Sequence, residues 1–516
     1  MRNIFGIMAA LCGLLAVAVP NGQAFTKDSL VWKKCTTCHE PAGGKISRVE
    51  EIRTTPEEWT VIVDRMARLH GMDLSKAEMD TLLKELCSTQ ILSPSELEKV
   101  SYLNLLNNPQ NMEIAKGADE EKQFITCVRC HSGAKIFSYR MNEASWAKLR
   151  DFHIYMLPSI VFQMREMKFV KEADEVLKVL AKTYPYGQAW KAASAKPVGS
   201  WRILGYEPGK GNYRGNATIS GGSNDDYAVK GSLVFDDGTT ENFQGEGTLY
   251  GGHAFRTRTT HDGNKTLGAF SFTDGKLRGE HHFPAPDFRT SQSVWYPVSE
   301  KAQLLKVSPA FLVKGEQTKL VLEGVKLPAV SADDVKFSKG SVKVLSARRI
   351  GPETIEVEAV SRENGLTKAD ISIKGLNGVP VTLAPQIDSV KILPEMGRSR
   401  LNGGRNRPAE GVQFEAVASA KSDAGEVVLG PVPAKFKLAA EIKRPNDDDL
   451  QWVGVIHPNG KYLPVGDYGS IAIREYTAEG SGIVKVEAEY KRGERVYPVK
   501  PANLIVTMPD YVQRIK

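Results

Sequence analysis

Two copies of one short motif constrain this chain more than any other feature of its sequence. The motif, Cys-x-x-Cys-His, occurs as Cys35-Thr36-Thr37-Cys38-His39 and as Cys127-Val128-Arg129-Cys130-His131. Two thiols separated by one helical turn can reach the two vinyl groups of a haem, and the adjacent histidine is then delivered beneath the iron. We therefore predict two covalently bound haem c groups, linked through Cys35, Cys38, Cys127 and Cys130, with His39 and His131 as iron ligands.

Two other uses of paired cysteines have to be compared with haem attachment. A zinc site of four thiolates would require both pairs to come together, and it gives no reason for a histidine after each pair. A redox-active dithiol of the thioredoxin type requires a strand-to-helix context that the sequence lacks. Cys87 is the one cysteine left over in the mature chain, and we expect it to be an inert buried thiol.

An internal repeat suggests the remaining iron ligands. After each motif comes a tryptophan and, seven residues later, a candidate ligand: Met66 follows Trp59, and His153 follows Trp146. Seven residues are two helical turns, so each pair lies on one face of a helix. We predict that Met66 completes the first haem site and His153 the second. The nearby alternatives are His70 and Met72 for the first haem, and Met156, Met164 and Met167 for the second.

The predicted ligands give the two haems different potentials. A methionine thioether raises the reduction potential of a haem, whereas a second imidazole lowers it. Electrons should therefore pass downhill from the second haem to the first. The helical stretches expected after the two candidate ligands are residues 75–86 and 172–182.

The N-terminus predicts export from the cytoplasm. Residues 1–24 combine a positive start, an apolar run and small residues before Phe25, as cleavable secretory signals do. The predicted location is the periplasm, and no later run is long and apolar enough to span a membrane. The net charge of +7 is spread among acidic residues, so it does not indicate nucleic-acid binding.

Strand patterns replace helical ones in the remainder of the chain. Asp-Gly pairs at 237–238, 262–263 and 274–275 lie beside alternating segments 227–235, 254–260 and 267–272, which predicts an antiparallel barrel. Segments 319–323, 355–360 and 371–374, and then 412–417, 483–490 and 504–508, predict two immunoglobulin-like sandwiches without disulfides. His281-His282 is the one adjacent histidine pair in this part, and neighbouring strand residues face opposite sides, which argues against a metal site there.

These patterns predict a multidomain, mainly β protein with an α-helical N-terminal part. The predicted divisions are a signal peptide at 1–24, a di-haem cytochrome c domain at 25–187 with halves of about 25–105 and 106–187, an antiparallel β-barrel at 188–300, and immunoglobulin-like β-sandwiches at 301–387 and 388–516. No nucleophile triad or carboxylate pair is recognisable, so no catalytic residue is assigned to this chain.

This order of a di-haem domain, a glycine-rich barrel and two disulfide-free sandwiches resembles the α subunit of quinohemoprotein amine dehydrogenase. The resemblance implies a heterotrimer with a β-propeller subunit and a small subunit whose cysteine tryptophylquinone oxidises primary amines. It also implies one haem with two histidines, one with histidine and methionine, and a soluble blue copper protein or cytochrome c as acceptor. Two alternatives remain open, a free-standing periplasmic di-haem electron carrier with β binding domains and a di-haem peroxidase-like enzyme.

Overall fold

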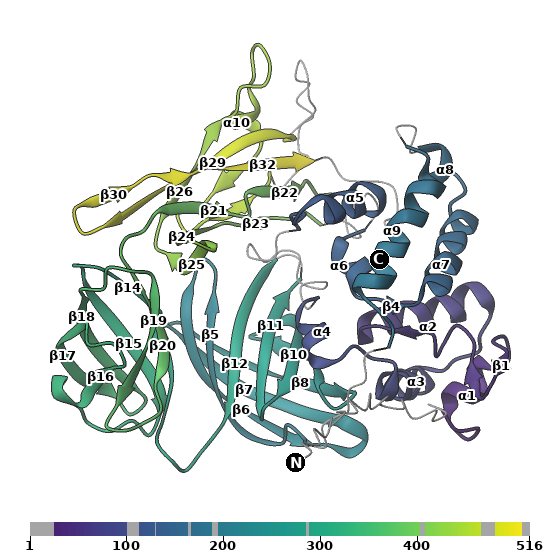
Figure 1. Ribbon diagram of the computed structural model, residues 1–516, viewed down its shortest axis with the longest axis horizontal. Coiled ribbons are helices and arrows are strands. Elements are labelled where there is room, and N and C mark those ends of the chain that lie inside the picture. Colours follow the sequence, from purple (N-terminus) through teal and green to yellow (C-terminus); the bar gives the residue numbers. More distant parts are fainter. Residues whose placement is uncertain are drawn as a thin grey trace, which may run out of the picture.

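The protein consists of a helical N-terminal part, a closed barrel and two further β units. The computed structural model describes residues 25–100, 113–128, 131–163, 167–187, 195–284, 288–402, 408–465 and 480–507. The helices lie on one side of the barrel, the first pair of sheets on the other side, and the C-terminal sheets lie over one end (Figure 1). The predicted fold class, mainly β with a helical N-terminal part, is confirmed.

The helices begin where short polar side chains can cap them. The side chains of Thr55, Ser75, Ser93 and Asn142 each accept a hydrogen bond from the backbone N–H three residues later. The helices are α1 Leu30–Cys35, α2 Pro56–His70, α3 Lys76–Thr89, α4 Pro94–Glu98, α5 Ala118–Cys127, α6 Gly133–Phe137, α7 Glu143–Met156, α8 Ile160–Gln163 and α9 Phe169–Thr183. Both predicted helical stretches are confirmed as parts of α3 and α9.

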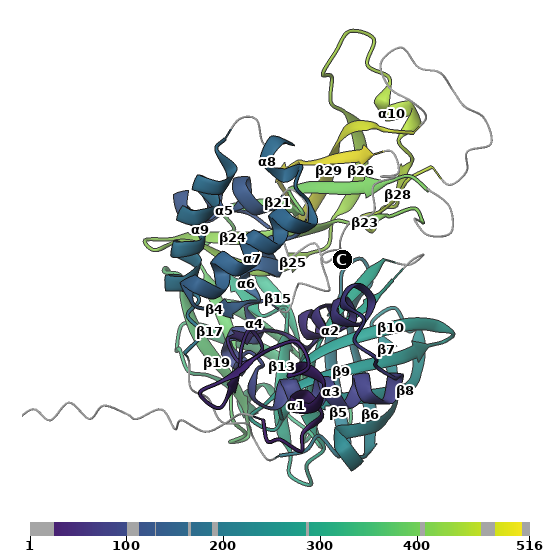
Figure 2. The same ribbon diagram turned by 90° about the vertical axis from the view of Figure 1, so that its right-hand side faces the viewer.

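The helical part is built from two equivalent halves. A shift of 87 residues carries Arg53 onto Arg140 and Trp59 onto Trp146. The short strands β3 (Ile52–Arg53) and β4 (Arg140–Met141) pair antiparallel, with Arg53 opposite Arg140. A second small sheet follows the first motif, formed by β1 (Pro41–Ala42) and β2 (Lys45–Ile46). In Figure 2, α5 to α9 lie together, with α1 and α3 farther down against the barrel. Equivalent residues therefore meet at the junction of the two halves.

The barrel closes through eight antiparallel strands. They are β5 Gly199–Glu207, β6 Gly211–Gly221, β7 Asp226–Phe235, β8 Thr240–Tyr250, β9 Ala254–His261, β10 Asn264–Thr273, β11 Lys276–Phe283 and β12 Arg289–Pro297, and β12 pairs with β5 to complete the circle. Alternate side chains fill the interior with aromatic rings, including Phe255, Phe270 and Trp295. The predicted barrel is confirmed.

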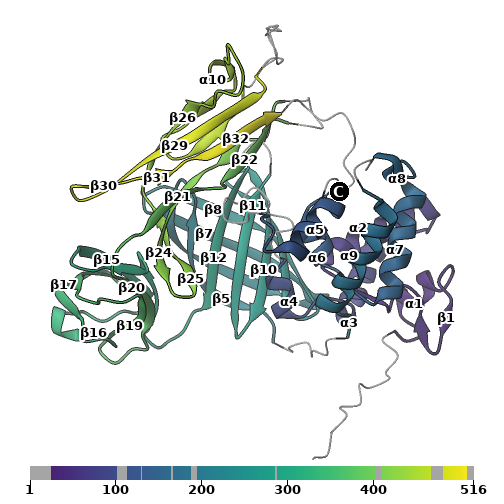
Figure 3. The same ribbon diagram turned by 45° about the horizontal axis from the view of Figure 1, so that its top comes forward.

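The two further β units are pairs of sheets that each share one hydrophobic core. The first unit packs the sheet β13-β15-β18-β17 against β14-β20-β19-β16, and the second packs β25-β24-β21-β31 against β22-β32-β29-β26 (Figure 3). The strands of the first are β13 Gln303–Ser308, β14 Phe311–Val313, β15 Gln317–Val325, β16 Val335–Phe337, β17 Val342–Gly351, β18 Thr354–Ser361, β19 Thr367–Ile373 and β20 Val379–Ala384. Those of the second are β21 Ser389–Leu393, β22 Met396–Arg400, β24 Glu415–Ser422, β25 Gly425–Val432, β26 Lys435–Ala440, β29 Gly482–Arg492, β31 Val499–Lys500 and β32 Ala502–Thr507.

The C-terminal unit carries additional short elements. A small sheet of β23 (Val412–Gln413), β27 (Val455–Ile456) and β28 (Lys461–Leu463) lies beside the main sheets, β30 (Arg495–Tyr497) pairs with β29, and α10 spans Asp449–Trp452. Asn459 donates a side-chain hydrogen bond to the carbonyl oxygen of Gly209, at 3.1 Å, and so joins this unit to the end of the barrel.

A buried polar contact joins the helical part to the barrel. His253 of the barrel is 1% exposed, and its Nε2 lies 2.9 Å from the carbonyl oxygen of Leu92, which follows α3. Arg256 of β9 forms an ion pair with Glu57 of α2. Cys87 of α3 is fully buried close to this contact, where burial and the charge of Glu57 raise its pKa well above the usual value. These contacts hold α2 and the C-terminal end of α3 at a defined place on the barrel wall.

Some predicted features lie outside the described residues. These are the signal at 1–24, Cys130, Met164 and the boundary between the two halves of the helical part. In the described part of the chain, no helix combines the length and the apolar character that crossing a membrane requires.

Candidate haem-binding sites

Both cysteine motifs begin at the last residue of a short helix. Cys35 ends α1, and the backbone N–H groups of Cys38 and His39 both donate to its carbonyl oxygen, at 3.2 and 2.8 Å. The chain therefore continues as a helical turn through the motif, which places the histidine one turn beyond the first thiol. Cys127 ends α5 in the same way, and its capping N–H, that of Val128, donates to the carbonyl oxygen of Phe124.

Two of the motif thiols have raised pKa values, which is unlike reactive dithiols. Burial raises the pKa of Cys35 to about 11, and the neighbouring Cys38 and Glu85 add to the rise. Burial alone raises the pKa of Cys127 to about 12. Redox-active dithiols have the opposite property, a lowered pKa at a helix N-terminus. Cys35, Cys38, Cys87 and Cys127 form no disulfides, and no described group of three or more His, Cys, Asp or Glu side chains could hold a metal ion.

The rings of His131 and His153 lie side by side at the second motif. The centroids of their rings are 6.4 Å apart, with an angle of 62° between the planes. An imidazole nitrogen lies about 2 Å from the metal it binds, and the ring centroid about 1 Å farther, so two imidazoles on opposite sides of one metal have centroids about 6 Å apart. The separation of the two rings is therefore compatible with both binding one iron ion.

The hydrogen bonds of these two rings leave the same nitrogen available on each. His131 Nδ1 lies 3.1 Å from the carbonyl oxygen of Ser132, and His153 Nδ1 lies 2.8 Å from that of Leu149. A carbonyl can only accept, so Nδ1 carries the proton in both rings and Nε2 is left with a lone pair for a metal. Burial lowers the pKa of His131, which keeps that ring neutral. Nε2 is thus the nitrogen that either ring could offer to a metal.

The first site has a proximal histidine in a comparable state. Burial and the charge of Arg48 lower the pKa of His39, although its hydrogen bond with the backbone of Ser47 acts in the opposite direction. Met66 is half-buried on α2, two turns after Trp59. The charge of His70 also lowers the pKa of His39, so His70 lies near the same site. Met66 therefore stays a prediction, with His70 and Met72 as its alternatives.

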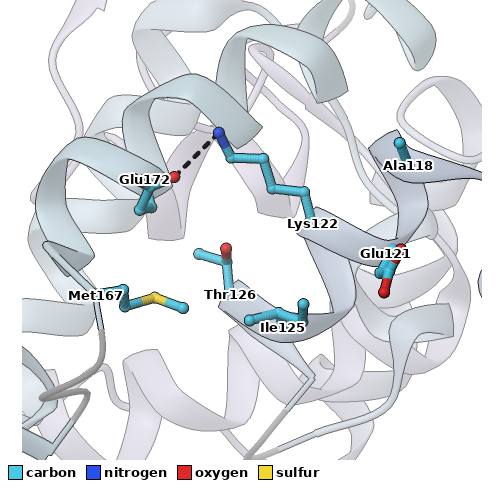
Figure 4. A pocket seen from close by; sticks show the side chains of 7 residues that line it. All are labelled: Ala118, Glu121, Lys122, Ile125, Thr126, Met167 and Glu172. Carbon is cyan, nitrogen blue, oxygen red and sulfur yellow. Dashed lines mark ion pairs between the residues drawn. The ribbon is translucent and has the colours of Figure 1, made fainter.

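One alternative ligand for the second site, Met167, has a packing role in the structure. Met167 extends into a cavity of about 370 Å³ between α5 and α9, where it lies near Ile125 and Thr126 while Lys122 pairs with Glu172 at the rim (Figure 4). It also packs against the small core formed by Phe169 and Ala173. Met167 is therefore engaged in packing, and His153, whose ring lies beside that of His131, stays the predicted ligand.

The helices that carry Met66 and His153 touch at the residues just before these two. The guanidinium of Arg65 lies over the ring of Phe152, 5.0 Å from its centroid. Arg65 and Phe152 are equivalent under the 87-residue shift, as are Arg53 and Arg140. Sequence reasoning missed these junction residues, although extending the repeat beyond the tryptophans would have aligned them. The two candidate ligands are consequently on adjoining helices.

The two adjacent histidines of the barrel lie on opposite faces of their strand. His281 points inward, with its ring centroid 5.0 Å from that of His261, whereas His282 lies on the other face of β11. This confirms that the adjacent histidines 281 and 282 cannot share a ligand. A cleft of about 580 Å³ at the end of the barrel is lined by charged side chains, among them Glu207, Lys210 and Arg289. The ion pair between Arg289 and Glu207 stabilises this end of the barrel.

Comparison with solved structures gives only weak similarity. A redesigned β-barrel shares 13% identity and covers 22% of this chain and 100% of its own, with a TM-score of 0.19. The SGBP-B protein of the Bacteroides ovatus mixed-linkage glucan utilization locus shares 9% identity and covers 62% of this chain and 69% of its own, with a TM-score of 0.17. No curated protein matches the chain significantly.

Family models match three separate parts of the chain. Residues 25–190 match the haem-binding part of the alpha subunit, described as "Quinohemoprotein amine dehydrogenase A, alpha subunit, haem binding". Residues 195–291 match domain II of the same subunit, and residues 390–515 match its domain IV. The matches follow one another in order, with residues 292–389 unmatched between the last two, cover most of the chain and concern one subunit. The chain therefore belongs to the family of quinohemoprotein amine dehydrogenase alpha subunits, the haem-binding subunits of an amine-oxidising oxidoreductase.

Proposed function

We propose that this chain is the di-haem electron-transfer subunit of a periplasmic amine dehydrogenase. It would receive electrons from a tryptophylquinone on a partner subunit, where primary amines are oxidatively deaminated, and deliver them to a soluble blue copper protein or cytochrome c. The observation that carries the proposal is the adjacent pair His131 and His153, with Nε2 available on each ring.

The residues that would hold the two haems come from both halves of the helical part. Cys35 and Cys38 would form the thioether links of the first haem, and Cys127 and Cys130 those of the second. His39 and Met66 would bind the first iron, and His131 and His153 the second. A bound haem supplies one-electron chemistry, which suits the stepwise transfer of the two electrons that an amine releases. The chain itself contributes ligands, burial and position.

The junction between the halves supports electron transfer within the chain. Because Arg65 of α2 contacts Phe152 of α7, the helices bearing Met66 and His153 are in direct contact. A thioether ligand on the first iron and a second imidazole on the other would make transfer from the second haem to the first downhill. The fold thus supports both a short route and a direction.

The surface near His153 supports association with another protein. Residues 152–162 contain no Asp, Glu, Lys or Arg, and Tyr155 and Phe162 are 76% and 75% exposed. Exposed aromatic side chains without nearby charges are typical of the centres of protein interfaces. In the proposed heterotrimer, with its β-propeller and quinone-bearing subunits, this surface would bring a partner next to the second haem. The exposed aromatic side chains of this uncharged segment favour a complex over a free-standing carrier.

The test measures haem content and iron ligation in the purified protein. Intact mass should show two haems per mature chain, and electron paramagnetic resonance should show one low-spin haem with two imidazole ligands. His153→Ala should remove that signal and leave the other haem unchanged, because the ring of His153 lies beside that of His131. Met167→Leu is the matched control and should preserve the signal. A single haem, or a signal that survives His153→Ala, would contradict the proposal.

A further inference from the structure

The indole N–H of Trp146 is buried and has no hydrogen-bond acceptor in the described part of the protein. Its ring is 3% exposed, and Nε1 has no hydrogen-bond partner. Within residues 25–187, as far as they are described, the other buried side-chain atoms in this condition are Thr54 Oγ1 and Gln123 Oε1. Buried polar groups in proteins are nearly always hydrogen-bonded, so an orphaned N–H points to a partner that the polypeptide does not supply.

The equivalent tryptophan of the first half shows that this is a local difference. Trp59, which the 87-residue shift carries onto Trp146, is 2% exposed, and its Nε1 donates to the carbonyl oxygen of Gln90 at 2.8 Å. The first half therefore satisfies its indole internally at the end of α3. The second half keeps the tryptophan and its burial but offers the indole no backbone acceptor.

The position of the orphaned N–H is well defined. Trp146 is in the first turn of α7, and its backbone N–H donates to the carbonyl oxygen of Asn142. The edge of its ring meets Tyr139, with centroids 6.3 Å apart, and the hydroxyl of Tyr139 donates to Glu58 at 2.7 Å. His153 follows two turns later on the same helical face, beside His131. Trp146 thus lies on the face of α7 that carries the proposed iron ligand, packed against Tyr139.

We propose that Trp146 Nε1–H donates a hydrogen bond to a carboxylate of the second haem and so fixes the orientation of that haem. The inference rests on the proposed function, since it requires a haem between His131 and His153. The carboxylates of the propionate side chains are the strong acceptors on the edge of a haem, and an N–H bond to a charged acceptor favours the charged form. Trp146 is accordingly a positioning residue for the second haem.

The test compares two variants that remove the indole N–H and keep an aromatic ring. Trp146→Phe and Trp59→Phe are prepared as haem-loaded protein with whatever subunits co-purify, and the reduction potential of the second haem is followed against pH. Losing a hydrogen bond to a charged acceptor raises proton affinity about tenfold. The pH at which the potential begins to depend on pH reports the pKa of the haem carboxylate. This pH should therefore rise by about one unit in Trp146→Phe. Trp59→Phe should leave that pH unchanged, because its lost bond is to a backbone carbonyl.

Two results would overturn the inference. The curve of Trp146→Phe would superimpose on that of the wild type if the partner were an ordered water, and equal shifts in both variants would indicate a general packing effect. If Trp146→Phe fails to load haem, the wild-type protein labelled with ¹⁵N-tryptophan is measured by NMR instead. One indole N–H resonance should then shift with pH over the same range in which the potential depends on pH. If no indole N–H resonance shifts in this range, the hydrogen bond is refuted. The number of haems in the wild-type protein is measured first, since a single haem refutes the proposed function. Two haems, together with an unchanged potential curve in Trp146→Phe, refute only this inference.

Discussion

Replacing Glu96 by Gln should strongly destabilise the helical part of the protein. Glu96 accepts hydrogen bonds from Arg53 at 2.9 and 3.1 Å and from Arg140 Nε at 2.8 Å. The side chains of all three residues are at most 8% exposed. The two arginines come from equivalent positions in the two halves, so one carboxylate joins the halves. Without its charge, two guanidinium groups remain buried with no opposing charge.

The size of the effect can be worked out in two ways. Removing one partner of a buried ion pair costs about 3–5 kcal/mol. Burial alone would raise the pKa of Glu96, but the hydrogen bonds from Arg53 and the Ser93 N–H, with the charge of Arg140, lower it to about 2. Compared with an unfolded pKa of about 4.3, this shift corresponds to about 3 kcal/mol. Because the folded pKa is lowered, this stability is present above the unfolded pKa and is lost as the pH falls towards 2.

Urea unfolding of the haem-loaded chain, followed by circular dichroism and haem absorbance, measures the effect. Glu96→Gln should lower the free energy of unfolding at pH 7 by about 3 kcal/mol. It should also flatten the loss of stability between about pH 5 and pH 2. The control is Asp64→Asn, which breaks an exposed i,i+4 pair with Arg68 and should cost about 0.5 kcal/mol or less. If Glu96→Gln lowers the free energy of unfolding by less than about 1 kcal/mol, Glu96 and the two arginines do not hold the halves together.

Three further outcomes are expected. Met66→Ala should abolish the weak charge-transfer absorption near the red edge that a bond from methionine sulfur to iron gives, and survival of that band would identify Met72 as the ligand. Cys87 should resist alkylation in the native protein at pH 8 and react after unfolding, because it is fully buried with a raised pKa; rapid native labelling would show that α3 separates from the barrel. Phe270→Ala should cost about 3–5 kcal/mol by leaving a cavity in the barrel core, with the haem spectrum unchanged.

Local chemistry explains why much of the barrel could be predicted. Asp262-Gly263 and Asp274-Gly275 have positive φ at both residues, the type I′ geometry that a two-residue hairpin requires. The pair Asp237-Gly238 behaves differently, because only Gly238 has positive φ and Asp237 instead accepts hydrogen bonds from the N–H and hydroxyl of Thr239. The turn was recognisable from its residues in all three cases, but its type depended on the length of the loop.

Long-range contacts explain what the sequence did not reveal. The spacing of Trp146 and His153 predicted a shared helical face, but only the folded chain shows His153 beside His131. The sequence around Arg53 does not indicate that Arg53 pairs with Glu96, 43 residues later. The docking of His253 on the carbonyl oxygen of Leu92 likewise spans 161 residues. Periodicity and turn chemistry are local, whereas these contacts depend on how whole units pack.

Reduction of the haems by a primary amine in the native complex tests the proposed function most directly. The protein is isolated from the periplasm without denaturation, its subunits are separated by denaturing electrophoresis, and haem absorbance is recorded anaerobically before and after an amine is added. We expect two further chains, one of them small, and reduction of both haems by the amine. A lone chain whose haems are indifferent to amines would contradict this account and favour a free-standing di-haem carrier.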